Sequence, residues 1–388
     1  MSLHTRDDLG GRAAVVGIGA TEFSKDSGRS ELSLAVEAVR AALDDAGLAP
    51  ADVDGLVTFT MDTNPEITVA QAAGIGELSF FSRVHYGGGA ACATVQQAAL
   101  AVAAGVAEVV VCYRAFNERS GRRFGSGVQQ REPSAEGAAL GWQLPFGLLT
   151  PASWAAMAAQ RYLHAYGLTP DAFGHVAVTD RRYAARNPAA YFHGKPITLA
   201  DHAASRWIVE PLRLLDCCQE TDGGQAIVVT SAERARDLRH PPAVILAAAQ
   251  GAGRKQEAMT SFYRDELTGL PEMGVVARQL WRTSGLAPTD IDVGILYDHF
   301  TPFVLMQLEE FGFCGPGEAA DFVAADALPI NTHGGQLGEA YLHGMNGIAE
   351  AVRQLRGTSV NQIPGAARTL VTAGTGVPTS GLILGTDG

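Results

Sequence analysis

The sequence predicts an α/β protein built from two duplicated β-α-β-α-β halves, and two observations support this prediction. Residues 47–54 (GLAPADVD) recur as residues 285–292 (GLAPTDID). The runs that we predict to be strands are short, apolar on both faces and separated by helical stretches, which is typical of sheets covered by helices. A chain of 388 residues can bury such a core without disulfide or metal crosslinks.

Each copy of the repeat predicts the end of a helix followed by a strand. Gly47 and Gly285 follow amphipathic stretches, and a glycine ends a helix where a left-handed residue is needed. The proline that follows in each copy prevents the helix from resuming. The next apolar run, at residues 55–59 and 293–296, is then predicted to be a strand.

The other elements occupy equivalent places in the two halves. The first half has predicted strands at 13–16 and 108–112, helices at 34–46 and 94–104, and a Gly-rich turn at 87–91; the second has strands at 243–248 and 369–372, helices at 275–284 and 344–355, and a Gly-rich turn at 334–338. We therefore assign residues 1–235 to the N-terminal half and residues 236–388 to the C-terminal half.

An insertion at about residues 115–205 interrupts the first half. It is richer in Arg, His, Tyr and Trp than the rest of the chain. Such a composition is expected of a loop domain above a functional site. A surface decoration without a role in the site is the alternative.

Composition excludes several classes of function. A net charge of −12 without a long Lys/Arg run argues against a nucleic-acid partner. No apolar run reaches ~18 residues and the first twelve residues lack a signal-peptide core, so we expect a cytoplasmic protein without a membrane span. Five cysteines, an odd number without metal-type C-x-x-C spacing, suit a reducing compartment and predict no metal site.

Several segments resemble the thiolase superfamily, and in particular its sterol-carrier-protein-X type. Residues 212–218 (LRLLDCC) and 221–223 (TDG) are similar to the signature before the last strand of the first half. Residues 160–162 (QRY) through 187–188 (NP) are similar to the loop domain of that subgroup. The resemblance covers nearly the whole chain. It implies a thiolase fold of α-β-α-β-α layers, usually in a homodimer, and residues 108–112 are a candidate edge strand for such a contact.

Four segments fall at the positions of the thiolase active-site motifs, but their residues differ from those motifs. Cys92 is placed at the nucleophile position, at the start of a helix. Tyr297, in Tyr-Asp-His-Phe, stands where the subgroup has His, and Tyr341 stands where the Gly-His-Pro histidine would fall. Residues 372–376 (TAGTG) have no cysteine where thiolases have their second.

These differences disfavour thiolase chemistry. A thiol with a pKa of about 8.5 needs a helix N-terminus or a neighbouring base to become a nucleophile. The helix start would help Cys92, but Tyr341 removes the histidine base, and the second cysteine is missing. Two tyrosines facing a thioester could instead carry out retro-aldol cleavage of a β-hydroxyacyl-CoA. The thioester is then the electron sink, so no bound cofactor is expected beyond the CoA of the substrate.

The paired tyrosines and residues 86–92 (YGGGAAC) resemble the actinobacterial steroid side-chain aldolases. The resemblance implies a carbon–carbon lyase that cleaves a 17-hydroxy-steroid with a C20 carboxyl-CoA side chain into a 17-ketosteroid and propionyl-CoA. It also implies an accessory hydratase, or its domain with a zinc ribbon and an OB-fold, as partner. Two alternatives remain open: an acyl-CoA thiolase that uses Cys92, and a non-catalytic subunit that binds acyl-CoA or sterol.

The candidate site residues follow from these motifs. We assign the general-base and general-acid roles to Tyr297 and Tyr341 without deciding which takes which. The other catalytic candidates each have a structural alternative: His343 as a hydrogen-bonded group, Asp298 as a helix cap, and Cys92 as a small hydrophobe. Candidates for binding the CoA thioester are Gly374 and Gly376, by close backbone approach, and Arg122, Arg123 and Arg254, by contact with phosphates unless these arginines only form a solvated basic patch.

Overall fold

The structure is a computed structural model that describes residues 9–85, 87–121, 123, 125, 141–256, 264–375 and 379–386. One nine-stranded sheet runs through both halves in the order β3-β2-β4-β7-β1-β8-β11-β10-β9. The first five of these belong to the N-terminal half: β1 (Ala13–Ala20), β2 (Gly55–Phe59), β3 (Phe80–Val84), β4 (Val109–Asn117) and β7 (Asp222–Ser231). The C-terminal half supplies β8 (Ala243–Gly251), β9 (Val293–Ile295), β10 (Arg368–Ala373) and β11 (Thr379–Gly385).

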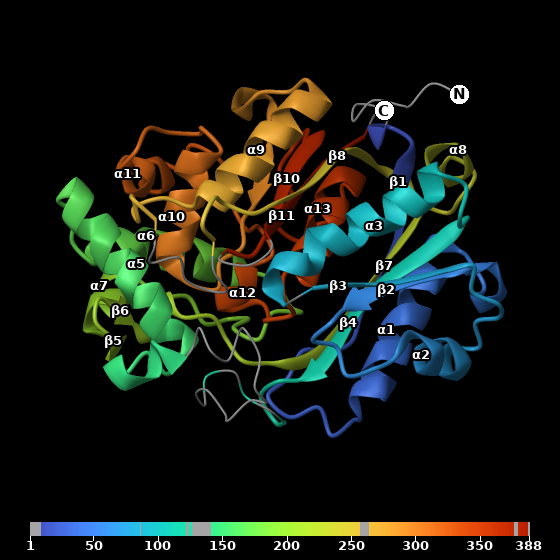
Figure 1. Cartoon of the computed structure of the whole chain (residues 1–388), viewed down its shortest axis with the longest axis horizontal. Helices are drawn as coiled ribbons and strands as arrows, with labels where there is room; N and C mark the ends of the chain where they lie inside the picture. The colour runs from blue at the N-terminus through green and yellow to red at the C-terminus, as the bar shows by residue number, and fades with distance from the viewer. Residues whose placement is uncertain are drawn as a thin grey trace.

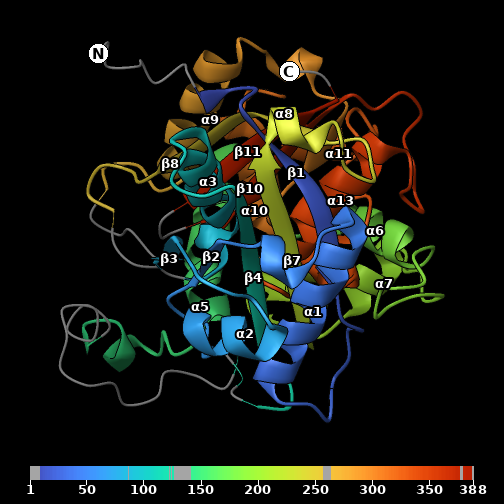
Figure 2. The same cartoon turned by 90° about the vertical axis from the view of Figure 1, so that its right-hand side faces the viewer.

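Helices form three layers around the two parts of this sheet. Helices α1 (Glu31–Ala46) and α2 (Glu66–Ala73) cover the outer face of the first part, and α9 (Pro271–Ser284) and α10 (Thr301–Glu310) cover the outer face of the second. Between the two parts lie α3 (Ala91–Ala103) and α13 (Met345–Arg356), which share one apolar core with strands of both halves. Figure 1 shows these layers from α9 down to α1, and Figure 2 shows α1 and α2 from the side. The predicted α-β-α-β-α layers are confirmed.

The two parts of the sheet meet at a short ladder. Strands β1 and β8 pair antiparallel through Ala14 with Val244 and Val15 with Ala243. Strand β4, proposed above as a candidate edge, lies instead between β2 and β7 and pairs with both. The edge placement was wrong, because an apolar run in the sequence does not show which strands will pair with it. At this end of the sheet the edge strand is β3, where the side chain of Phe81 is 61% exposed.

The insertion forms most of a helical subdomain beside the sheet. It contains α5 (Pro151–Tyr166), α6 (Asp171–Ala184) and α7 (Leu199–Ala204), followed by a hairpin of β5 (Trp207–Val209) and β6 (Leu212–Arg213). The other short helices are α8 (Ala232–Ala235), α11 (Ala319–Ala324) and α12 (Gly335–Gly338). Among the residues that the structure describes, no helix has both the length and the apolar composition needed to cross a membrane.

The repeated segment has the same local structure in both copies. Gly47 and Gly285 end α1 and α9 in the left-handed conformation, with φ of 73° and 70°. Asp54 accepts hydrogen bonds from the backbone N–H groups of Glu108 and Val109, at 3.0 and 2.9 Å. Asp292 does the same for Ala367 and Arg368, at 2.9 and 2.8 Å. Each aspartate thus connects the start of one strand to the loop that enters the neighbouring strand.

We predict that Asp54→Ala and Asp292→Ala each lower the free energy of unfolding by about 1–3 kcal/mol, because each leaves two strand-entry amides without an acceptor. The losses should add in the double variant, since the two sites lie in different halves. Denaturant unfolding measures these values, with Glu77→Ala, at an exposed carboxylate, as the matched control. Unfolding midpoints equal to that of the control would contradict the proposed role of the two carboxylates.

Candidate active site

The candidate site is a cavity of about 1150 Å³ where both halves and the insertion meet. Residues at the carboxyl ends of β2, β3, β4 and β10 line it, as does the segment after β9. The insertion and the hairpin after it add apolar walls, including Trp154, Phe192 and Ile208. Pockets for drug-sized ligands measure about 300–1,000 Å³, so this cavity accommodates a larger ligand.

The two predicted tyrosines meet in this cavity. The Tyr297 hydroxyl donates a hydrogen bond to Tyr341 Oη at 3.2 Å. The backbone fixes both residues, because the Tyr297 N–H donates to Thr372 Oγ1 and the Tyr341 N–H donates to Thr221 Oγ1, each at 2.9 Å. Burial raises the pKa of Tyr297 and of Tyr341 well above the ordinary tyrosine value, so both are neutral phenols near pH 7.

Glycines make room for the tyrosines. A Cβ on Gly88 would lie 1.8 Å from the Tyr297 hydroxyl oxygen, so no side chain fits there while the tyrosine keeps its place. A Cβ on Gly374 would lie 2.3 Å from the Cα of Gly89, and Gly374 has a φ of 70°. The two Gly-rich turns therefore touch through their backbones, and both line the cavity.

His343 lies in the cavity wall as a neutral histidine. Its Nδ1 accepts a hydrogen bond from Arg114 Nε at 3.1 Å, and its ring stacks on Phe116. Burial, followed by the charge of Arg114, lowers the pKa of His343 well below the ordinary histidine value. Because a guanidinium only donates, Nδ1 carries no proton and the ring proton is on Nε2. His343 can thus donate a hydrogen bond to an oxygen without being an acid.

Asp298 does not contact the tyrosine hydroxyls. Its carboxylate accepts hydrogen bonds from the backbone N–H groups of Gln336 and Leu337, at 2.8 and 2.9 Å. It is a helix cap for α12, which was the structural alternative, and it is absent from the described cavity lining. Since α12 leads into the segment that carries Tyr341, Asp298 stabilises the helix that positions this segment.

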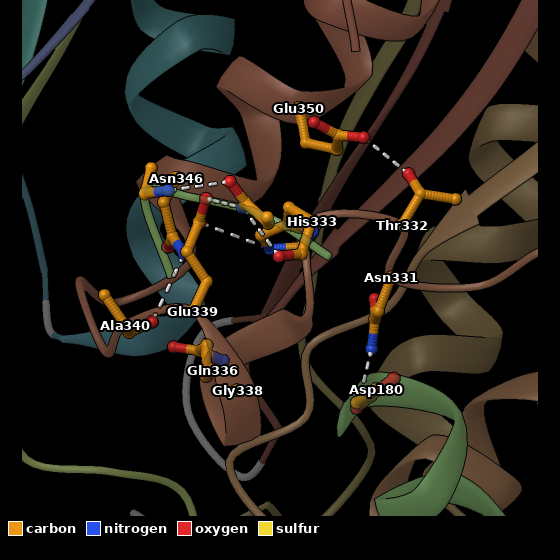
Figure 3. Close-up of polar contacts among 12 residues, drawn as sticks. Asp180, Asn331, Thr332, His333, Gln336, Gly338, Glu339, Ala340, Asn346 and Glu350 are labelled. Carbon is orange, nitrogen blue, oxygen red and sulfur yellow. Dashed lines mark hydrogen bonds and ion pairs between the residues drawn. The ribbon is translucent and has the colours of Figure 1, made fainter. Parts of the chain in front are cut away.

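A buried polar cluster contacts the residues just before Tyr341 (Figure 3). Glu339 accepts hydrogen bonds from Asn187 Nδ2 at 3.0 Å and from Asn346 Nδ2 at 2.8 Å. Asn346 also donates to the carbonyl of Ala340, the residue before Tyr341. The cluster connects the insertion, the tyrosine segment and α13 by buried hydrogen bonds.

Cys92 does not lie where a nucleophile would. The structure turns its Sγ toward the carbonyl oxygen of Val371, at 3.6 Å, inside the apolar core. Burial raises the pKa of the Cys92 thiol, so the start of α3 does not make it a thiolate, contrary to what helix placement alone suggested. Among the described residues that line the cavity, Gly87, Gly88 and Gly89 occupy the stretch before the helix, and Cys92 is not one of them.

The predicted CoA-binding arginines are separated. Arg123 lines the cavity and forms an ion pair with Glu220 at 2.6 Å. Arg254 is exposed and is not among the described cavity-lining residues. Arg122 and Gly376, like Tyr86 of the YGGGAAC segment, lie outside the described residues, so their assignments stay predictions.

Sequence reasoning missed a row of side chains at the end of β4. Arg114 and Phe116 face the same side of β4, Glu118 follows the end of the strand, and all three line the cavity. Arg114 forms a buried ion pair with Asp62 at 2.9 Å. The signal was available in the sequence, since Arg114 and Glu118 are charged residues at the end of a strongly apolar run, where charged side chains are unusual.

Comparisons with known proteins agree with this geometry. Residues 253–386 match the family described as Thiolase C-terminal domain-like. The chain is 68% identical to the steroid side-chain-cleaving aldolase of Thermomonospora curvata over 98% of this chain and 99% of the relative. It is also 68% identical to the 17-hydroxy-3-oxo-4-pregnene-20-carboxyl-CoA lyase of Mycobacterium tuberculosis, over 97% of this chain and all of the relative.

A solved structure described as an Ltp2-ChsH2(DUF35) aldolase superposes on this chain with a TM-score of 0.94. The two chains are 68% identical, and the match covers 98% of this chain and 99% of the other. Together with the thiolase layers and the tyrosine pair, this similarity shows that the chain belongs to the steroid side-chain-cleaving aldolases of the thiolase superfamily.

Proposed function

We propose that the protein cleaves the side chain of 17-hydroxy-3-oxo-4-pregnene-20-carboxyl-CoA by a retro-aldol reaction, giving a 17-ketosteroid of the androstenedione type and propionyl-CoA. The observation that carries this proposal is the pair of tyrosine hydroxyls, 3.2 Å apart in the cavity, at two positions where the family motifs have histidines. The name of the Mycobacterium tuberculosis relative supports the choice of substrate.

The cavity suits such a ligand at both ends. Apolar walls from Trp154, Leu149 and Ile208 match a sterol ring system, whose burial supplies binding energy. Basic side chains of Arg123 and Arg206 also line the cavity, and their charge suits the phosphates of CoA. The reacting bond joins the sterol to the thioester and would lie between these ends, at the tyrosines.

The tyrosines would divide the proton transfers between them. Tyr341 is the more accessible of the two and relays the proton of the 17-hydroxyl, giving up its own proton as it receives that one, so that the oxygen forms a carbonyl and the bond to the side chain breaks. The electrons of that bond enter the thioester as an enolate, which the His343 Nε2–H and the Gly-rich turn before α3 can stabilise. Tyr297 then protonates the α-carbon, which completes propionyl-CoA.

We propose a cytoplasmic homodimer that works with an accessory protein, for which the sequence predicted a hydratase or its domain with a zinc ribbon and an OB-fold. The DUF35 part of the solved aldolase complex supports this partner. The edge strand β3, with exposed Phe81, is a surface suited to pairing two copies of the chain.

We predict that Tyr297→Phe and Tyr341→Phe each reduce kcat by about 10²–10⁴-fold and leave the fold intact, because only a proton-transferring hydroxyl is lost. Co-purified chain and DUF35 partner would be given the 17-hydroxy steroid CoA thioester, with 17-ketosteroid release followed by mass spectrometry. Tyr166→Phe, on α5 and outside the described cavity lining, is the matched control. Near-normal rates in both single variants would overturn the mechanism.

The thiolase alternative predicts a different result for Cys92. Since the thiol is buried and faces Val371, we expect Cys92→Ala to keep its cleavage rate and to lose only about 1 kcal/mol of stability. Intact-protein mass spectrometry after incubation with propionyl-CoA or acetoacetyl-CoA should show no acyl adduct. Acylation of Cys92, or loss of activity in the variant, would return the protein to thiolase chemistry.

The third alternative, a non-catalytic subunit, predicts binding without products. It would be supported if the co-purified complex bound the steroid CoA thioester and released neither 17-ketosteroid nor propionyl-CoA. The well-defined hydrogen bond between the tyrosines is unexpected for a subunit that only binds, since two buried hydroxyls are costly unless they are paired.

A further inference from the structure

The tyrosines alone leave the reaction without a proton acceptor at neutral pH. Tyr297 is buried and Tyr341 is half-buried, and the loss of solvent raises the pKa of each above the ordinary tyrosine value. A neutral phenol can pass a proton from one neighbour to another, but it is a poor base. The proton that leaves the 17-hydroxyl therefore needs another group to hold it until the α-carbon receives it.

The carboxyl of Glu118 is the group in the cavity best placed to hold it. Glu118 follows β4, lines the cavity with Tyr297 and Tyr341, and is only 3% exposed. Its Oε2 has no hydrogen-bond partner among the residues that the structure describes. A buried carboxyl oxygen without a partner is costly, which is expected where a reaction uses that oxygen.

Thr221 connects Glu118 to the tyrosine pair. Its backbone N–H lies close enough to the Glu118 carboxylate to lower the pKa of that group. Its hydroxyl oxygen accepts the N–H of Tyr341 at 2.9 Å, and the hydroxyl lies 3.2 Å from the Tyr341 carbonyl oxygen. Thr221 therefore lies beside both the Glu118 carboxyl and the backbone of Tyr341, and Glu118 and Tyr341 line the same cavity. Because Tyr341 accepts the hydrogen bond of Tyr297, its own hydroxyl proton is directed to another acceptor.

We propose that Glu118 is the proton-holding group of the retro-aldol reaction, reached through Tyr341. The O–H bond of the 17-hydroxyl breaks, its electron pair forms the carbonyl, and the proton passes by way of Tyr341 to the Glu118 carboxylate. The carbon–carbon bond breaks and leaves the thioester enolate. The enolate carbon takes the proton of Tyr297, and the proton held by Glu118 returns through Tyr341 to Tyr297. The enzyme ends unchanged, and no oxidant, reductant or co-reactant is needed.

The surroundings of Glu118 suit this task. Burial and then the charge of Glu220 raise its pKa well above the ordinary carboxyl value, while Arg114 and Lys25 act in the opposite direction. Such a carboxylate is a stronger base than an exposed one. The titratable and charged groups of the described chain that share its wall or act on it are Lys25, Arg114, Cys218, Glu220, Tyr297, Tyr341 and His343.

The proposal rests on the proposed function, and one set of variants tests it. In the complex with the DUF35 partner, we expect Glu118→Gln to lower kcat by about 10²–10⁴-fold with little change in KM for the 17-hydroxy steroid CoA thioester. Circular dichroism and thermal unfolding report on the fold, and Glu118→Asp, which keeps the carboxyl one methylene further away, should recover part of the rate.

The pH profile of kcat/KM separates catalysis from a merely structural role. Only the deprotonated carboxylate accepts a proton, so the rate should rise with pH through the pKa of Glu118, at a pH above the usual carboxyl range. Glu220→Gln removes a negative neighbour, lowers that pKa and should move the rise to lower pH. Lys25→Gln removes a positive neighbour and should move it to higher pH.

These experiments distinguish failure of the proton-holding role of Glu118 from failure of the proposed function. If the wild-type complex cleaves the substrate, and Glu118→Gln cleaves it equally fast with the same pH profile, the proton-holding role is overturned and the proposed function stands. If Glu118→Gln is misfolded, the two neighbour variants decide. A pH profile of kcat/KM that is the same in the wild type, Glu220→Gln and Lys25→Gln overturns the proton-holding role of Glu118. If the wild-type complex does not cleave the substrate, the proposed function fails and this inference fails with it.

Discussion

The hydrogen bond between the Tyr297 and Tyr341 hydroxyls is the contact on which the rest of the site depends. It brings together the segment after β9 and the segment after α12, which are more than forty residues apart in the chain. It requires a glycine at position 88, where any Cβ would occupy the position of the Tyr297 oxygen. It also requires the caps and polar groups behind Tyr341, because a buried hydroxyl pair tolerates little displacement.

The duplicated fold explains how such a pair arises on this scaffold. The carboxyl ends of the parallel strands in both halves open toward the same cavity, so a side chain that follows one strand faces a turn that follows another. The second half supplies the tyrosines and His343, and the first half supplies the Gly-rich turn, Arg114 and Glu118. A thiol is not needed in this arrangement, and the cysteine that remains in α3 packs in the core.

The sequence predicted the layers and the meeting of the two tyrosines in one cavity, because both have local signals. The repeat at Gly47 and Gly285 marks helix ends whatever the rest of the chain does, and Tyr341 falls at the position of a motif histidine without a gap. Cys92 and Asp298 were ambiguous because the direction of a side chain depends on packing that position in the sequence does not specify. Glu118 was missed because its role depends on burial by segments about a hundred or more residues away, including Thr221 and Tyr341.

Isotope labelling in deuterated water tests the central claim most directly, namely that an exchangeable proton of the enzyme is delivered to the α-carbon as the carbon–carbon bond breaks, without a covalent intermediate. The complex would be mixed with the 17-hydroxy steroid CoA thioester in D₂O, and mass spectrometry would give the masses of both products and of the intact protein. We predict equal amounts of 17-ketosteroid and propionyl-CoA, one deuterium at the α-carbon of the latter, and an unmodified protein. An acyl adduct on the protein, or propionyl-CoA formed without the 17-ketosteroid, would contradict it.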